Sequence, residues 1–171
     1  HAEHQRFAEI ILGTETFALM PYGKKPYSYI LVNKAFEIRL SERMHPTCHV
    51  QFFSEALWRE GLDALEARFN RWCQSLELRP IRREVVARVD CAFDYHLPSI
   101  DFTADCFVSR AAIDVQHREY RKVQTFRMGQ GEVVIRVYNK IAEIEQQSGK
   151  SWFFQLWGRN DEVWRIEIQL R

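Results

Sequence analysis

An alternating stretch, Val133-Val-Ile-Arg-Val-Tyr-Asn-Lys140, constrains this chain more than any other part of its sequence. Successive side chains of a β-strand point to opposite faces. The apolar residues at positions 133, 135 and 137 therefore share one face, and Arg136, Tyr138 and Lys140 share the other. Positive charge near a phenol favours the phenolate and attracts phosphate. The pattern predicts a tyrosine able to attack a phosphodiester.

Two further stretches, Arg88–Asp94 and Trp164–Arg171, alternate in the same way. Asp90 and Asp94 fall on one face of the first, and Glu167 falls among the polar residues of the second. If the three strands share a sheet, its polar face holds the groups of a metal-assisted nucleophilic site. The alternative is a solvated face without function, which is common in antiparallel sheets. Carboxylates and cations around one tyrosine favour the site.

The rest of the chain predicts an α+β fold with a largely antiparallel sheet. One apolar face would be covered by helices, and one polar face would carry the active site. The 171 residues, 46% of them hydrophobic, are enough for one domain with a substantial core. Residues 17–20, 27–33, 35–40 and 48–53 predict a β-meander. Residues 1–12 show partial helical spacing.

A long helix is predicted from Ser54, as its N-cap, to about Leu76, with an apolar stripe that packs on the apolar face of the sheet. Residues 123–140 predict a β-hairpin that turns at Gln130. Residues 141–147 predict a helix that Gly149 ends. The aromatic run at residues 152–157 is expected to close the core.

The net charge of +1 is not the strongly basic balance typical of nucleic-acid binders, so contacts to DNA would depend on local clusters. One cluster contains Arg82 and Arg83, just before the Arg88–Asp94 strand, and the other contains Arg121 and Lys122. Guanidinium and ammonium groups suit a phosphate backbone. For the first cluster, a solvated connector is an equal alternative.

Four segments, in order along the chain, carry a resemblance to a known family. The replication initiation factor family resembles this chain over roughly residues 20 to 171. It includes the rolling-circle Rep proteins of the Rep_trans type, related phage initiators and relaxases of integrative conjugative elements. The matching segments are Arg88-Val-Asp-Cys-Ala-Phe-Asp94, Thr125-Phe-Arg-Met-Gly129, Arg136-Val-Tyr-Asn-Lys-Ile-Ala-Glu143 and Trp164-Arg-Ile-Glu-Ile-Gln-Leu-Arg171.

The resemblance implies a DNA nicking and strand-transfer endonuclease. Tyr138 would be the nucleophile that forms a covalent 5′-phosphotyrosine, and Lys140 would stabilise the phenolate or the charge that develops on phosphate. A Mg²⁺ or Mn²⁺ ion would take oxygen ligands. The candidate ligands are Asp90, Glu143 and Glu167, with Asp94 fourth, and the candidate DNA contacts are Arg136, Arg165, Arg82, Arg83, Arg121 and Lys122.

The resemblance also implies the partners and the setting. Single-stranded or cruciform origin DNA would be the substrate, with a helicase as a further candidate partner. The protein would initiate rolling-circle replication or conjugative transfer in the bacterial cytoplasm, encoded by a plasmid, phage or conjugative element. We expect residues 1–171 to be one catalytic domain of a longer protein, without a membrane segment. Two other functions remain open: a non-catalytic nucleic-acid-binding module and a metal-dependent phosphoester hydrolase.

Overall fold

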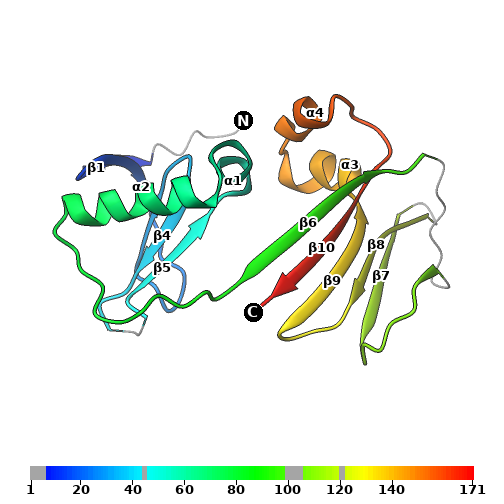
Figure 1. The fold of residues 1–171 in the computed structure, drawn as a ribbon, viewed down its shortest axis with the longest axis horizontal. Coiled ribbons are helices and arrows are strands. Elements are labelled where there is room, and N and C mark those ends of the chain that lie inside the picture. Colours follow the sequence, from blue (N-terminus) through cyan, green and yellow to red (C-terminus); the bar gives the residue numbers. More distant parts are fainter. Residues whose placement is uncertain (1–6, 44–45, 99–105, 120–121) are drawn as a thin grey trace. The chain divides into compact units, whose positions relative to one another are not determined.

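The chain is an α+β protein with two antiparallel sheets, each of five strands among the residues that are described (Figure 1). The computed structural model describes residues 7–43, 46–98, 106–119 and 122–171. They form two compact units, His1–Arg83 and Glu84–Arg171. The prediction of a single catalytic domain over residues 1–171 stays a prediction. In the described part of the chain, no helix combines the length and apolar character that crossing a membrane requires.

The first unit contains a β-meander in which every strand pairs with the next, as the sequence predicts. Its strands are β1 (Ala8–Leu12), β2 (Glu15–Leu19), β3 (Tyr29–Val32), β4 (Phe36–Leu40) and β5 (Cys48–Phe52). The helical spacing of residues 1–12 was misleading for β1. A turn at Gly13, with a φ of 56°, folds β1 back along β2, and this pairing satisfies the backbone groups of both strands.

The predicted long helix is two helices, α1 (Ser54–Glu60) and α2 (Leu62–Ser75), separated by Gly61. Gly61 has a φ of 84°, which a glycine adopts without the strain that a Cβ atom would cause. The N-cap is Phe53 and no side chain caps the helix, so the prediction of a Ser54 cap was wrong. The two helices together cover the predicted range.

Helix α2 packs on one face of the first sheet. Leu65 and Trp72 are almost fully buried, and they join a core with Phe17, Phe36 and Ile38. The Trp72 indole also donates a hydrogen bond of 3.0 Å to the backbone carbonyl of Leu12. The predicted apolar stripe is therefore correct, and its partner is the β1–β5 sheet.

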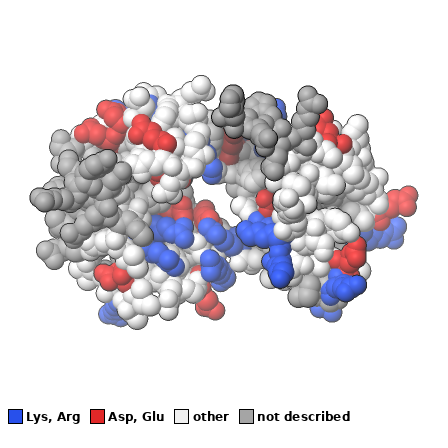
Figure 2. All heavy atoms as spheres, turned by 180° about the vertical axis from the view of Figure 1, so that it is seen from behind, with Lys and Arg blue, Asp and Glu red and all other residues white. Residues whose placement is uncertain are grey.

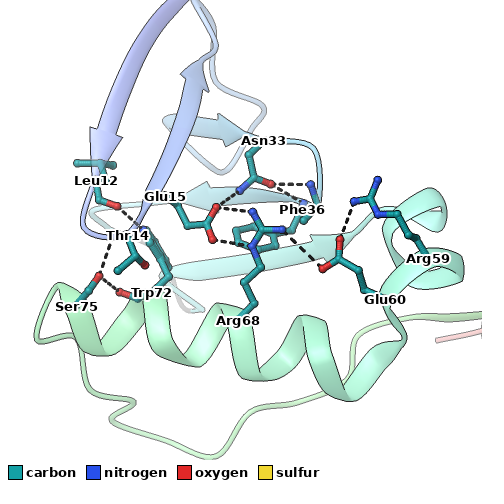
Figure 3. A network of polar contacts seen from close by, with 11 residues as sticks. Leu12, Thr14, Glu15, Asn33, Phe36, Arg59, Glu60, Arg68, Trp72 and Ser75 are labelled. Atoms are coloured by element: carbon teal, nitrogen blue, oxygen red, sulfur yellow. Dashed lines mark hydrogen bonds and ion pairs between the residues drawn. The ribbon is translucent and has the colours of Figure 1, made fainter.

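A charged network fastens α2 to the sheet (Figure 3). Arg68 donates two hydrogen bonds to the Glu15 carboxylate, at 2.6 and 2.7 Å. Glu15 also accepts a bond of 3.1 Å from Asn33, whose own side-chain oxygen accepts from the backbone of Phe36 at 2.9 Å. Bidentate arginine–carboxylate pairs fix the relative orientation of the two side chains and also stabilise the contact. The network joins α2, β2 and the β3–β4 turn.

The second unit contains the strands that the sequence assigned to the site, and they are neighbours. The sheet order is β6-β10-β9-β8-β7, so β10 lies between β6 and β9. The strands are β6 (Val89–His96), β7 (Asp114–Glu119), β8 (Lys122–Met128), β9 (Val133–Asn139) and β10 (Val163–Leu170). The predicted hairpin is β8–β9, and Gly129 and Gly131 on either side of Gln130 have φ values of 84° and 87°.

Short helices follow β9. Helix α3 (Lys140–Glu143) continues into a π-helical turn, η2 (Ile144–Ser148), which ends at the left-handed Gly149 as predicted. Helix α4 (Trp152–Trp157) comes next. Phe153 of α4 is fully buried, and the Arg165 Cζ atom lies 4.5 Å from its ring centre. Because Arg165 belongs to the polar face of β10, α4 packs on that face.

We predict that the α2–sheet network contributes to the stability of the first unit. Glu15→Ala removes two charge-assisted bonds to Arg68 and should lower the free energy of unfolding by about 2 kcal/mol. Urea denaturation followed by circular dichroism would measure it. Glu60→Ala is the control, because its contact to Arg68 is 3.8 Å long and partly exposed and should cost less than about 1 kcal/mol. Equal effects of the two variants would refute the assignment.

Candidate active site

Strand pairing collects the polar residues of the three strands on one face of the second sheet. Tyr138 of β9 lies opposite Arg165 of β10, and Arg165 lies opposite Asp94 of β6. In the next row, Arg136 lies opposite Glu167. Paired residues of antiparallel strands project to the same side, with side chains close enough to interact. The register therefore confirms the shared polar face that the alternation predicts.

The Tyr138 hydroxyl is bonded to a carboxylate that a third residue orients. The phenol donates to Oε2 of Glu167 at 3.0 Å, and Arg136 donates to Oε1 of the same carboxylate at 2.6 Å. The other terminal nitrogen of Arg136 donates to Gln169 at 3.3 Å. A nucleophile, an adjacent base and a group that orients the base are the usual parts of an activated nucleophile.

Arg165 forms a second ion pair on this face, in the same row as Tyr138. It donates two bonds to Asp94, at 2.6 and 2.7 Å, and its side chain is 7% exposed. The Trp157 indole of α4 donates to the same carboxylate at 3.2 Å. Asp94 thus neutralises a buried guanidinium, and α4 is fixed to the pair through Trp157.

Lys140 forms a third ion pair where β9 meets α3. Its ammonium bonds to Glu143, which also accepts a bond of 3.2 Å from Ser148. The Lys140 Nζ atom lies 5.8 Å from the centre of the Tyr138 ring. Asn139 begins α3 by accepting a bond from the Ala142 amide, and this cap turns Lys140 and Glu143 toward the tyrosine.

Burial changes the pKa values of Tyr138 and Lys140. It raises the pKa of Tyr138, and the charge of Glu167 raises this pKa further, while Arg165 acts in the opposite direction. Burial lowers the pKa of Lys140, and the hydrogen bond that its ammonium donates to Glu143 acts in the opposite direction. The sequence had predicted that neighbouring cations would favour the phenolate. That expectation was wrong for the free protein, because each cation is paired with a carboxylate and the phenol is only 9% exposed.

The carboxylates predicted as metal ligands do not form one cluster. Glu167, Glu143 and Asp94 surround the Tyr138 region, each bound to its own cation. Asp90 pairs with Arg88 at 2.6 Å and lies four residues along β6 from Asp94, about 13 Å away. Within the described residues, no three His, Cys, Asp or Glu side chains are grouped to hold a metal ion. Carboxylate oxygens suit Mg²⁺ or Mn²⁺, and to bind such an ion Glu167, Glu143 or Asp94 would have to exchange its paired cation for the metal.

The predicted DNA contacts belong to different parts of the chain. Arg136 and Arg165 belong to the site, whereas Arg82 and Arg83 lie in an exposed segment at the end of the first unit. Arg121 lies outside the described residues, and Lys122 begins β8 with its side chain outside them. On the surface shown in Figure 2, basic and acidic side chains are interspersed, in keeping with the net charge of +1.

Three residues of the site had no predicted role. Gln169 was placed on the polar face by alternation, but only the register shows it beside Arg136. Trp157 belonged to a run expected to close the core, so its bond to Asp94 was missed. Ser148 carries no sequence signal, since it reaches Glu143 through the π-helical turn.

Comparisons of the chain with models of protein families, with curated proteins and with solved structures found no match.

We predict that Glu167→Gln lowers the pKa of Tyr138, because it removes a negative charge that opposes ionisation of the phenol. The phenolate absorbance would be titrated in Glu167→Gln and in the Glu167→Gln/Tyr138→Phe double variant. Their difference isolates Tyr138 from the other five tyrosines. The same difference between the unmodified chain and Tyr138→Phe gives the reference pKa of Tyr138. An unchanged or higher pKa would contradict the described electrostatics.

Proposed function

We propose that this chain is a DNA nicking and strand-transfer endonuclease in which Tyr138 attacks a phosphodiester. The observation that carries the proposal is the bond of 3.0 Å from the Tyr138 hydroxyl to Glu167, together with the Arg136 contact that orients Glu167. A phenol with a raised pKa needs a base, and a carboxylate at hydrogen-bond distance is placed to be one. The resemblance to replication initiation factors supports the choice of DNA.

The proposed step transfers a phosphoryl group from the 3′ oxygen of the DNA to the Tyr138 oxygen. As the Tyr138 oxygen bonds to phosphorus, its proton passes to Oε2 of Glu167, and the bond from phosphorus to the 3′ oxygen breaks. The products are a 5′-phosphotyrosine and a 3′-hydroxyl. The leaving oxygen needs a proton, for which the Lys140 ammonium is the candidate donor. The lowered pKa of Lys140 suits such a donor. The covalent link conserves the energy of the broken phosphodiester bond, so that the DNA strand can be rejoined.

Arg136 and Arg165 would hold the phosphate. Guanidinium groups bind phosphate through two parallel bonds, as Arg165 binds the Asp94 carboxylate here, while Arg136 donates one bond to Glu167. The oxygens of an incoming phosphate would share the guanidinium groups with these carboxylates or displace the carboxylates from them. Positive charge would then face the attacked phosphorus, where negative charge develops in the transition state.

The other elements of the proposal derive from the resemblance. They are a role in rolling-circle replication or conjugative transfer, origin DNA as substrate, a helicase partner, a bacterial cytoplasmic setting, and a requirement for Mg²⁺ or Mn²⁺. A binding module or a phosphoester hydrolase could use the same charged face. The bond from Tyr138 to Glu167 favours the nickase, because neither alternative needs a phenol bonded to a base.

We predict a covalent protein–DNA adduct that depends on the Tyr138 hydroxyl. Single-stranded oligonucleotides carrying candidate origins would be incubated with the protein and Mn²⁺ and resolved on a denaturing gel. The adduct should be absent in Tyr138→Phe and after chelation with EDTA. Cleavage without an adduct would indicate the hydrolase, and binding without cleavage of any oligonucleotide in a library would indicate the binding module.

We predict that Glu167→Gln slows adduct formation by about 10²- to 10⁴-fold, the usual contribution of a general base. Single-turnover rates measured across pH would show it. Because hydroxide replaces the missing base, the defect should shrink as pH rises. Glu132→Gln, at an exposed position of the β8–β9 turn, is the matched control and should keep the full rate. A Glu167→Gln variant as fast as the control would exclude Glu167 as the base.

A further inference from the structure

Helix α4 is unusually aromatic for a helix of six residues. Its sequence is Trp152-Phe-Phe-Gln-Leu-Trp157, without a charged side chain. Trp152 stacks on Phe153 with ring centres 3.7 Å apart and 23° between the planes. Trp157 stacks on Phe153 at 4.9 Å and 25°. Phe153 is fully buried, whereas both tryptophans are partly exposed. Three nearly parallel rings therefore reach from the interior to the surface.

The residues of the candidate active site fix this aromatic stack in place. Phe153 lies under two cations of the site, with Arg165 Cζ at 4.5 Å and Lys140 Nζ at 5.2 Å from its ring centre. Trp157 donates its indole proton to Asp94, the partner of Arg165. Lys140 is also close to the Tyr138 ring. The stack therefore contacts the ion pairs that flank the proposed nucleophile.

The charges around α4 favour one kind of ligand. Lys150 precedes the helix and is exposed. Arg159 follows the helix and is partly exposed. Rings flanked by cations match a chain of flat bases joined by phosphates. An apolar peptide would use the aromatic surface and the exposed Leu156, but it would make no use of the positive charge at the two ends of the helix.

We propose that Trp152 and Trp157 form a stacking platform for bases of single-stranded DNA next to the phosphate that Tyr138 attacks. The inference rests on the proposed function and gives its substrate a definite form. In a duplex the neighbouring base pairs occupy both faces of each base. An unpaired base offers a free face to an indole, whatever its identity. The platform thus selects single strands without reading sequence.

Fluorescence anisotropy with a labelled oligothymidylate tests the platform. All variants would carry Tyr138→Phe, so that binding is measured without covalent chemistry. Trp152→Leu keeps bulk but removes the aromatic face, and it should weaken binding roughly 5- to 100-fold. Trp152→Phe keeps a ring and should lose about threefold or less. Trp58→Leu is the control, because Trp58 is 53% exposed on α1 of the first unit, and it should leave affinity unchanged.

Three results would overturn the platform: full affinity in Trp152→Leu, an equal loss in Trp58→Leu, or an equal loss of affinity for a hairpin duplex. If circular dichroism shows that Trp152→Leu is unfolded, the platform is tested by tryptophan fluorescence of the unmodified chain and of Trp152→Phe. Bound oligothymidylate should quench the unmodified chain more than Trp152→Phe, because a stacked indole is quenched. Equal quenching of the two would also overturn the proposal.

The failure of this inference differs from the failure of the proposed function. If the unmodified chain forms the adduct and Trp152→Leu binds normally, the nickase is supported and the platform is wrong. If oligothymidylate binding depends on Trp152 but no oligonucleotide yields an adduct, the platform is supported and the nickase is wrong.

Discussion

The hydrogen bond between Tyr138 and Glu167 is the interaction on which the proposed chemistry of this protein depends. It requires β10 to lie between β6 and β9, because only that order places Glu167 and Arg165 beside the tyrosine and Asp94 beyond them. A shift of one residue in the pairing would turn these side chains to the other face. The fold of the second unit therefore serves, in part, to hold one register.

Pairing of charges is the second feature of the site. Arg136, Arg165 and Lys140 each face one carboxylate, so buried charge is neutralised within the sheet face. Burial, together with the negative charge of Glu167, raises the pKa of the phenol and keeps Tyr138 protonated in the free protein. In the proposed mechanism, the incoming phosphate competes for the guanidinium groups, and the released carboxylate can take the phenol proton. Substrate binding and activation of the nucleophile would then be one event.

Much of the second unit could be predicted from alternation alone. Period-two patterns identified β6, β9 and β10, and glycines marked the β8–β9 turn. What alternation could not supply was the environment of each residue. It placed Lys140 on a polar face but not in a nearly fully buried position, and it gave no sign that the aromatic run of α4 packs on that face. Burial of a charged residue depends on what packs above it, and a local pattern does not contain that information.

Similar reasons explain the errors in the first unit. The spacing of residues 1–12 suited a helix, but pairing with β2 satisfied more backbone groups. Gly61 divided a helix whose apolar stripe continued across the break. In both places a long-range contact or a single backbone conformation outweighed the local pattern.

The most direct test of the account is to locate the covalent bond. The protein would be incubated with a cleavable single-stranded oligonucleotide, digested with a protease and a nuclease, and its peptides identified by mass spectrometry. We expect a nucleotide attached through phosphate to the tyrosine of the β9 peptide, at Tyr138. A nucleotide on any other residue, or cleaved DNA with every peptide unmodified, would contradict it.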